Sequence, residues 1–452
     1  MEEKKYIFVY GAGISGQGVA EVLGKQGEEV ILYNDQAKEV DAALEQLLVA
    51  KGGKVVRGED PTKLLENSKY MVISPGIPPT TATAQKAKAL GVEIIGEVEQ
   101  ASRLYKGKWV GVTGTNGKTT TTTLLGKMLA TLPVKTAIGG NIGYALSKET
   151  EDLDAASYLA AELSSFQLEG ITSLRVHIAL ILNITPDHIE RHGTLENYIA
   201  AKANIFKYQL PEDVLILNAD DATVKGFAAQ AKGRVCYISC KEILPTGVYI
   251  ENGNFVINLD GKKQIVCAVD AMKIFGAHNE QNALGAIACA YFAGVTIENM
   301  AQVLKAFQGV EHRIEYVKTI KGVPYYNDSK ATNTDSVIKA LEAFKAGHVI
   351  LLAGGHDKMT DLTELMQLVK VKTDGLILLG EAKERFYTAA KNAGVENIYL
   401  VDSFAAAVEK AYSIAHEPQV VLLSPACSSY DMFANFPERG RVFKALVEKL
   451  PC

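Results

Sequence analysis

The chain has 452 residues, of which 48% are hydrophobic and 22% are charged, a composition that excludes a long disordered or collagen-like protein. At about 150 residues per domain, this length indicates roughly three domains. The 47 basic and 52 acidic residues leave a net charge of −5. Charge therefore does not favour a nucleic-acid partner or an anionic membrane surface.

Targeting and cysteine patterns both indicate a cytoplasmic protein. The sequence has no run of the roughly 20 apolar residues that a membrane span needs. The apolar stretch that starts at Tyr6 ends before Gly11, which is too short for the core of a signal peptide. The six cysteines lack the paired spacing of a zinc site, so reduced thiols are expected. We expect a cytoplasmic monomer with small-molecule partners and no membrane partner.

Residues 1–98 are predicted to form a Rossmann-like domain, because short apolar runs alternate with helical patterns. The strands and helices expected there lie at 6–10, 16–26, 29–33, 70–74, 83–90 and 92–95. The first strand leads into Gly11, Gly13 and Gly16, and Asp35 closes the next strand. Such glycines let a diphosphate approach the backbone at a helix N-terminus. The pattern indicates a nucleotide site, and its alternative is glycines that serve helix–strand packing.

Residues 99–309 are predicted to form a central domain around a phosphate-binding loop. A strand at 109–113 leads into Gly114, Thr115, Asn116, Gly117, Lys118, Thr119 and Thr120. The loop amides can surround phosphate oxygens, Lys118 adds positive charge for the β- and γ-phosphates, and the Thr119 hydroxyl can bind Mg²⁺. Val112 stands where the general pattern has its first glycine. The alternative is a plain helix start, but such a start needs no lysine, so we predict a triphosphate site.

Later strands of the central domain end in residues suited to metal binding. Glu162 ends a strand at 158–162, where a carboxylate beside a phosphate loop can hold Mg²⁺ directly or through water. His188 follows a strand at 178–183, and Lys202 lies on the next helix. By themselves, these two residues indicate a structural histidine and a surface lysine. The remaining elements expected here are a strand at 214–218 and helices at 279–294 and 297–307.

Residues 310–452 are predicted to form a third, Rossmann-like domain. It begins with a hairpin and then repeats strand–helix units, which is typical of a parallel sheet. The strands expected there lie at 315–319, 323–327, 349–353, 376–379, 398–401 and 420–423.

Taken together, these motifs resemble the Mur ligase family, the ATP-dependent amide-bond ligases of peptidoglycan precursor synthesis. The resemblance covers essentially the whole chain and places motifs in each predicted domain. Its motifs are residues 11–16, 114–120, 162–167, 183–188, Lys202, 278–283, 312–313, 327–333 and 424–440. The fold that it implies is α/β with three domains: a Rossmann-like N-terminal domain, a central P-loop domain with a mostly parallel sheet, and a Rossmann-like C-terminal domain.

The resemblance also implies a reaction. The first domain and the segment 424–440 are similar to the family members that add D-glutamate to UDP-N-acetylmuramoyl-L-alanine. ATP would phosphorylate the alanine carboxylate, and the amine of D-glutamate would displace phosphate from the acyl phosphate. The implied cofactors are ATP, two Mg²⁺ ions and a CO₂-derived carbamate on Lys202.

By this resemblance, each substrate has its own set of residues. The UDP-sugar would contact Ile14, Ser15, Asp35, Gln36, Ser74, Gly76, Asn141 and His188. ATP would contact residues 114–120, Asn279, Arg313 and Asp328. D-Glutamate would contact Thr332, Lys358, Ser428, Ser429, Tyr430 and Phe436. The metal ligands would be Thr119, Glu162, His188 and carbamylated Lys202, and the catalytic residues Lys118, Glu162, His188 and Lys202. His356 departs from the family pattern, which has an acidic residue there.

Three alternatives remain open at this point. A nicotinamide-dependent oxidoreductase would explain Gly11–Gly16 but leaves Lys118 and Glu162 unused. Another ligase of the same family would add a different amino acid to the sugar nucleotide or extend folate with glutamate. A non-catalytic nucleotide-binding module would need neither Glu162 nor Lys202.

Overall fold

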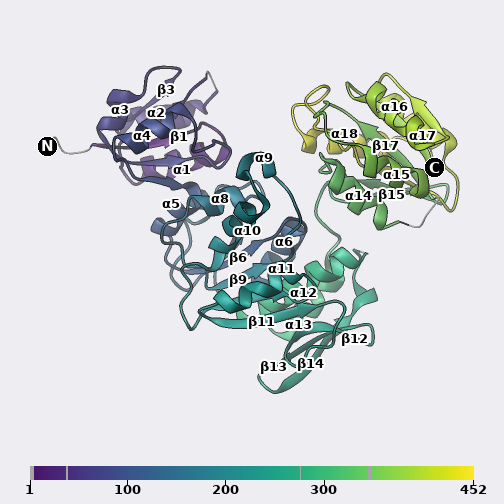
Figure 1. The fold of residues 1–452 in the computed structure, drawn as a ribbon, viewed down its shortest axis with the longest axis horizontal. Coiled ribbons are helices and arrows are strands. Elements are labelled where there is room, and N and C mark those ends of the chain that lie inside the picture. Colours follow the sequence, from purple (N-terminus) through teal and green to yellow (C-terminus); the bar gives the residue numbers. More distant parts are fainter. Residues whose placement is uncertain (1–4, 37–38, 275, 345–347, 452) are drawn as a thin grey trace. The chain divides into compact units, whose positions relative to one another are not determined.

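The computed structural model describes residues 5–36, 39–274, 276–344 and 348–451. The chain divides into two compact units, Met1–Met272 with His278–Phe307 and Lys273–Ala277 with Gln308–Cys452 (Figure 1). No described helix is long and apolar enough to cross a membrane. Five cysteines are free thiols, and Cys452 lies outside the described residues.

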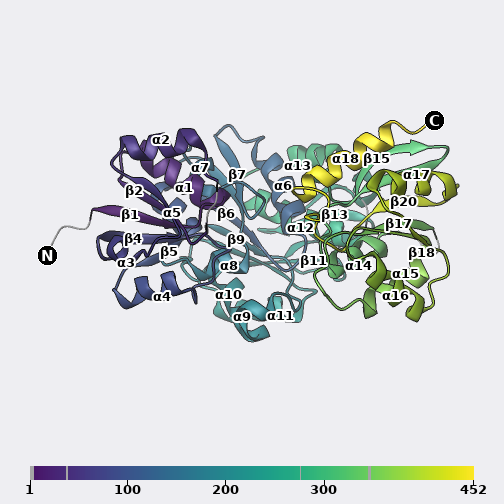
Figure 2. The same ribbon diagram turned by 90° about the horizontal axis from the view of Figure 1, so that it is seen from above.

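The first unit begins with a five-stranded, all-parallel sheet in the order β3-β2-β1-β4-β5. Its elements are β1 (Tyr6–Tyr10), α1 (Ile14–Lys25), β2 (Val30–Asn34), α2 (Ala42–Ala50), β3 (Lys54–Arg57), α3 (Thr62–Glu66), β4 (Ser68–Ile73), α4 (Ala82–Ala89) and β5 (Ile94–Gly96). Successive side chains of a strand point to opposite faces, so Ile7 and Val9 pack with α1 and α2, while Phe8 and Tyr10 pack with α3 and α4. Figure 2 shows the two helix pairs on opposite sides of this sheet. The Rossmann-like prediction is confirmed.

A nine-stranded sheet forms the rest of the first unit, in the order β14-β13-β12-β11-β10-β9-β6-β8-β7. Its strands are β6 (Lys108–Thr113), β7 (Thr136–Gly140), β8 (Tyr158–Glu162), β9 (Ile178–Ile181), β10 (Val214–Asn218), β11 (Arg234–Ser239), β12 (Gly247–Glu251), β13 (Asn254–Leu259) and β14 (Lys262–Ala268). The strands from β7 to β12 are parallel, and β13 and β14 are joined by antiparallel pairing. The predicted mostly parallel central sheet is therefore confirmed.

The helices of this part connect and cover the strands. They are α5 (Glu97–Leu104), α6 (Lys118–Leu129), α7 (Leu146–Glu149), α8 (Ser165–Glu169), α9 (Ile189–His192), α10 (Leu195–Ala203), α11 (Ala222–Gly226), α12 (Ala277–Phe292) and α13 (Ile297–Ala306). Trp109, Leu159 and Leu215 of the strands share a buried core with Tyr198 of α10 and Leu168 of α8. This core supports the sheet directly beneath the loops that leave its carboxyl edge.

The helix α5 carries two buried glutamates at the junction between the two sheets. Glu97 accepts hydrogen bonds through Oε1 from the Ser147 backbone N (2.7 Å) and Oγ (3.0 Å), while its Oε2 has no partner among the described residues. Burial raises the pKa of Glu97 to about 7. Glu99 accepts hydrogen bonds from Thr172, Ser173 and the Leu174 backbone. Burial alone would raise the pKa of Glu99, but these donors lower it.

The second unit is a six-stranded sheet in the order β15-β16-β20-β17-β18-β19. Its elements are β15 (Glu315–Ile320), β16 (Val323–Asn327), α14 (Thr334–Glu342), β17 (Val349–Gly354), α15 (Thr363–Lys372), β18 (Thr373–Leu379), α16 (Lys383–Ala393), β19 (Ile398–Leu400), α17 (Phe404–Ile414), β20 (Val420–Leu423) and α18 (Phe436–Glu448). Only β15 is antiparallel, and it forms the predicted hairpin with β16. One buried core packs α14, α15 and α16 against the sheet, and another packs α17 and α18, on opposite sides in Figure 2. The Rossmann-like prediction is again confirmed.

Candidate active site

The phosphate-binding loop leaves the carboxyl end of β6, next to the ends of β8 and β9 in the central sheet. Ligands in open parallel sheets bind at this edge. Gly117 precedes α6 in a left-handed conformation with φ 83°, and a Cβ there would lie only 2.1 Å from the Asn282 Oδ1. A glycine is therefore required on both conformational and steric grounds.

Lys118 is folded onto its own loop. Its Nζ donates hydrogen bonds to the carbonyls of Gly114 (2.9 Å) and Thr115 (2.8 Å). The ammonium group is thus held against the carbonyls of its own loop. Thr119 and Thr120 are buried in the first turn of α6.

Asn183 fixes the loop from the end of β9. Its Oδ1 accepts from the Asn116 backbone N (2.8 Å), and its Nδ2 donates to the Asn116 carbonyl (3.2 Å). The Thr115 hydroxyl also lies 3.0 Å from the Tyr198 hydroxyl on α10. The sequence motifs contained Asn183, but only the contacts of Asn183 and Tyr198 identify these two residues as ones that hold this loop.

Glu162 lies at the end of β8, as predicted, and is 1% exposed. Its Oε1 accepts from the Asn141 amide (2.7 Å), whereas its buried Oε2 has no hydrogen-bond partner among the described residues. An unpartnered buried carboxylate oxygen is costly unless a cation compensates it. Carboxylate and hydroxyl oxygens are the ligands that Mg²⁺ prefers. This part of the predicted metal site therefore fits a magnesium ion.

Lys202 is buried on α10 rather than exposed to solvent, with 1% of its surface accessible. Its Nζ donates to the Gly114 carbonyl at 2.7 Å, the same oxygen that accepts from Lys118, and lies over the Tyr198 ring. Burial, followed by the positive charge of Lys118, lowers the pKa of Lys202 well below its usual range. The interpretation of Lys202 as a surface lysine is wrong, because its side chain is buried against the loop.

His188 stands at the start of α9 in a left-handed conformation with φ 53°. Its ring lies 4.8 Å from that of Phe166, and its Nε2 lies 3.5 Å from the Asp187 Oδ2. In the described part of the chain, its recorded contacts do not include Glu162 or Lys202. On α12, the predicted ATP contact Asn279 accepts from the Asn282 amide at 3.1 Å.

The glycine-rich loop after β1 is closed by its neighbours. Gly16 packs against the Gly11 carbonyl, where a Cβ would come within 1.7 Å, and the Ser74 hydroxyl donates to that same carbonyl. Ile14 is 71% exposed at the start of α1. Ser15 follows it on the helix, and Gly76 lies in the turn after β4.

Asp35 lies just after β2, at the same edge of the sheet. It accepts hydrogen bonds from the Tyr10 hydroxyl and from the Thr83 hydroxyl (3.1 Å), so both of its oxygens have partners within the chain. Gln36 beside it is exposed, and its carbonyl accepts from the Asn34 amide. The predicted uridine contacts Asp35 and Gln36 thus both have hydrogen-bond partners within the chain.

The second unit brings the predicted D-glutamate residues together on loops at one edge of its sheet. Lys358 Nζ donates to the Thr332 carbonyl at 3.0 Å. Burial lowers the pKa of Lys358. The remaining predicted residues are buried Ser428 and Ser429, exposed Tyr430 and half-buried Phe436.

Two further predicted positions of the second unit have partners of their own. Asp328, the predicted ribose contact, is buried and accepts from the Ser424 hydroxyl (2.6 Å) and from the backbone next to Arg313, at Ile314 (3.2 Å). Burial raises the pKa of Asp328 to about 7. His356 pairs with Glu381 at 2.6 Å. The family pattern has an acidic residue at position 356. In this chain, an acidic side chain still lies there, because Glu381 contacts His356.

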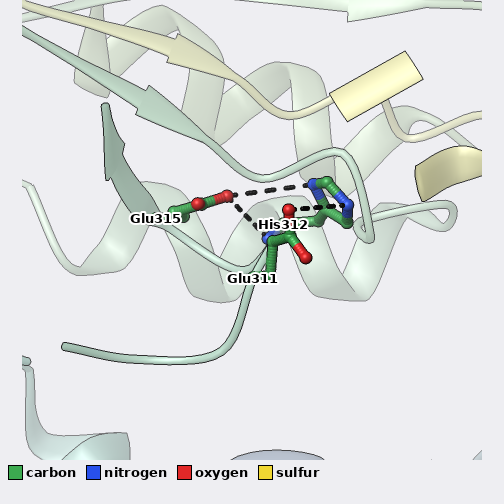
Figure 3. A group of neighbouring side chains, drawn as sticks. All are labelled: Glu311, His312 and Glu315. Carbon is green, nitrogen blue, oxygen red and sulfur yellow. Dashed lines mark hydrogen bonds and ion pairs between the residues drawn. The ribbon is translucent and has the colours of Figure 1, made fainter. Parts of the chain in front are cut away.

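One group outside the predicted site has metal-ligand geometry. Figure 3 shows Glu311, His312 and Glu315 with their side chains directed toward one another. The Lys444 ammonium already binds both carboxylates, at 2.7 and 2.9 Å, and the Asn327 amide donates to His312 Nδ1 and to Glu315. These donors satisfy the ligand atoms, so the group is best explained as an ion-pair cluster.

Comparison with known proteins places all three parts of the chain in one family. Residues 5–96 match the MurD-like N-terminal domain of Mur ligases, residues 112–290 the Mur ligase middle domain, and residues 312–427 the glutamate ligase domain of Mur ligases.

Curated relatives match over almost the whole length. UDP-N-acetylmuramoylalanine–D-glutamate ligases from Caldanaerobacter subterraneus (42% identity, 99% of each chain covered), Pelotomaculum thermopropionicum (41%, 99% of this chain and 98% of the relative) and Desulfitobacterium hafniense (42%, 99% and 98%) are among them. This identity extends through all three predicted domains.

Solved structures share the fold at lower identity. The UDP-N-acetylmuramate–alanine ligase MurC from Thermotoga maritima has a TM-score of 0.62 at 18% identity, covering 98% of this chain and 99% of that one. MurF from Acinetobacter baumannii also has a TM-score of 0.62 at 18% identity, covering 98% and 93%. With its domain matches and its full-length relatives, the chain belongs to the Mur ligase family.

Proposed function

We propose that this protein is the ATP-dependent ligase that joins D-glutamate to UDP-N-acetylmuramoyl-L-alanine during peptidoglycan precursor synthesis. The observation that carries the proposal is the full-length similarity to relatives of that name, at 42% identity over 99% of the chain. A nicotinamide-dependent oxidoreductase and a non-catalytic module are both set aside by this family membership.

The chemistry requires activation, because a carboxylate and an amine do not condense in water. The alanine carboxylate oxygen attacks the γ-phosphorus of ATP, and the bond from this phosphorus to ADP breaks. The amine of D-glutamate then attacks the acyl carbon, loses a proton, and expels phosphate together with the carboxylate oxygen. The protein's contribution is therefore positional and electrostatic.

Lys118 is proposed to neutralise charge on the transferring phosphoryl group. Its hydrogen bonds to the carbonyls of Gly114 and Thr115 hold the ammonium over the loop, and a phosphate oxygen is a stronger partner for a cation than a neutral carbonyl. Asn183 keeps the loop in shape, so the backbone amides stay fixed during the reaction. ATP would also contact Asn279, Arg313 and Asp328.

We further propose that Thr119, Glu162, His188 and carbamylated Lys202 hold two Mg²⁺ ions. Bound magnesium supplies positive charge to the triphosphate and to the reacting carboxylate. The Glu162 Oε2 is available for this role because Asn141 engages only Oε1.

The carbamate on Lys202 is proposed from the environment of its amine. An uncharged amine can attack CO₂ to give an anionic carbamate and release one proton. The carbamate would place an anion beside Lys118, and the Gly114 carbonyl would no longer be shared by two amines. The result would be a further oxygen ligand at the carboxyl edge of the sheet.

The other two sites follow the same proposal. The UDP-sugar would bind at Ile14, Ser15, Asp35, Gln36, Ser74, Gly76, Asn141 and His188, and D-glutamate at Thr332, Lys358, Ser428, Ser429, Tyr430 and Phe436. The proposed domains are residues 1–98, 99–309 and 310–452. We also keep the cytoplasmic monomer as a proposal.

Phosphate release tests the function directly. With ATP, Mg²⁺ and UDP-N-acetylmuramoyl-L-alanine, we expect phosphate release only when D-glutamate is added, and not with L-glutamate, L-lysine or meso-diaminopimelate. The control omits the sugar nucleotide. Equal rates with another amino acid would contradict D-glutamate specificity, and NADH consumption would reopen the oxidoreductase.

A further inference from the structure

The second unit contains one fully buried arginine. Arg439 lies in the first turn of α18 and is 1% exposed. Its guanidinium donates four hydrogen bonds: from Nε to the Ser329 Oγ (3.0 Å), from Nη2 to the carbonyls of Ser329 (2.9 Å) and Cys427 (3.1 Å), and from Nη1 to the Ser428 carbonyl (3.2 Å). Every one of these acceptors is neutral.

Arg439 is a buried cation without a bound counter-ion. In the part of the chain that the structure describes, no carboxylate forms an ion pair with it, and Asp328 and Asp431 act on it only through longer-range attraction. Burial lowers the pKa of Arg439 to about 10, so the guanidinium remains charged at neutral pH. Burying an unpaired charge is unfavourable, and neither the proposed chemistry nor the predicted site accounts for it.

The acceptors come from loops that follow neighbouring strands. Ser329 follows β16, and Cys427 and Ser428 follow β20. The loop after β17 also reaches the guanidinium, since a Cβ on Gly355 would lie 3.2 Å from the Arg439 Nη1. Arg439 therefore joins three loops at the carboxyl edge of the sheet.

These three loops carry the residues proposed to bind D-glutamate. Thr332 follows Ser329, Lys358 follows Gly355, and Ser428 itself accepts a bond from Arg439. Burial lowers the pKa of Lys358, and repulsion from the positive charge of Arg439 lowers it further. D-Glutamate brings two carboxylates, and the cations at these loops include Lys358 and Arg439.

We propose that Arg439 is a positioning residue of the D-glutamate site, which aligns the three loops and supplies a fixed positive charge that favours an amino acid with two carboxylates. This inference rests on the proposed function. Arginine suits the role because its planar fork holds several acceptors at once, which a lysine ammonium cannot reproduce.

The test compares Arg439→Lys with Arg439→Met in the full-length enzyme. Hydrogen bonds that involve a charged group are each worth enough to change a binding constant by about 10- to 100-fold. We expect KM for D-glutamate to rise about 10- to 100-fold in Arg439→Met, and by less in Arg439→Lys, which keeps the charge but loses the fork. KM for ATP and for the sugar nucleotide should change less than twofold in both.

Val447→Ala is the matched control, because Val447 is a buried core residue near the opposite end of the same helix. It should lower the melting temperature and leave all three KM values unchanged. If Arg439→Met does not fold, the KM values of Arg439→Lys decide whether the inference holds. Unchanged KM for D-glutamate in Arg439→Lys and in any folded Arg439→Met, or an equal rise in all three KM values, would overturn the inference. Wild-type enzyme without D-glutamate-dependent phosphate release would instead overturn the proposed function.

Discussion

Lys202 on α10 and Arg439 on α18 are both basic residues that are 1% exposed. Both donate hydrogen bonds to neutral oxygens: Lys202 to one carbonyl, and Arg439 to four acceptors. Burial lowers the pKa of each group, but only lysine can readily lose its charge. The same burial therefore lowers the pKa of a lysine well below its usual range in one unit, and it leaves a permanent buried cation in the other.

The neighbours explain why the two domains use different side chains. Lys202 shares the Gly114 carbonyl with Lys118, so a second positive charge there is unfavourable. Arg439 bonds to loops proposed to receive an amino acid with two carboxylates, where a fixed positive charge is useful. Substitutions at four positions, Lys118, Lys202, Glu97 and Glu99, test and sharpen this contrast.

The largest effect is expected for Lys118→Ala, which removes the cation of the phosphate-binding loop. We expect kcat to fall on the order of 1,000-fold or more, because charge on the transferring phosphoryl group loses its partner. Affinity for the sugar nucleotide, measured by calorimetry, should stay close to wild type, since its proposed diphosphate and uridine contacts lie in the other sheet. Lys127→Ala, an exposed position on the same helix, is the control. Near-normal turnover of Lys118→Ala would refute the phosphate-loop assignment.

Lys202→Arg gives the central site the side chain that the C-terminal site uses. Arginine cannot form the carbamate, so we expect kcat to fall about 100-fold or more through loss of a metal ligand. Lys202→Ala should be partly rescued by small carboxylates or bicarbonate, whereas Lys202→Arg should not. The exposed Lys207→Arg serves as the control. Full activity of Lys202→Arg would show that a cation suffices at this position, and the contrast with Arg439 would disappear.

The smallest effect is expected for Glu97 and Glu99. These two buried carboxylates of α5 also differ from each other, because the pKa of Glu97 is raised and that of Glu99 is lowered. The pKa of Glu97 is about 7 in the folded chain, above its usual 4.5, so the folded state binds more protons between these values. Unfolding free energy should therefore fall as pH rises from about 4.5 to about 7, by up to roughly 3 kcal/mol from this group.

Chemical denaturation across this pH range checks the prediction. In Glu97→Gln, the unfolding free energy should fall less steeply with pH, because the contribution of Glu97 is gone. Asp328, whose pKa is also about 7, continues to contribute to this pH dependence. Glu99→Gln removes a carboxylate that the fold keeps ionised, and it should destabilise the protein near neutral pH without flattening the slope. Identical slopes for wild type and Glu97→Gln would contradict the buried, protonated state of Glu97.

Most of the parallel core was predictable, because its strands are short, continuous apolar runs between glycines and helices. The strands β7 and β11 to β14 were not predicted. In β14, for example, the first three residues, Lys262 to Gln264, are polar and exposed, which conceals the alternation of the strand. The strand β3 was missed for a similar reason, since Lys54 and Arg57 flank only two valines.

The candidate site shows the same limit. Local motifs identified Lys118 and Glu162, because the features that indicate their roles, a glycine-rich loop and the end of an apolar strand, are each only a few residues long. The burial of Lys202 depends on α10 packing against a loop 88 residues earlier in the sequence. The bonds of Arg439 join Ser329 and Ser428, which lie 110 and 11 residues away. Such partners follow from the tertiary fold, which a single sequence does not display.

The central claim, activation of a carboxylate by phosphoryl transfer, is tested most directly by oxygen-18 transfer. UDP-N-acetylmuramoyl-L-alanine labelled in the alanine carboxylate is incubated with the enzyme, ATP, Mg²⁺ and D-glutamate, and the released phosphate is analysed by mass spectrometry. The account predicts one labelled oxygen in each phosphate released. Phosphate without label, alongside amide product, would contradict it.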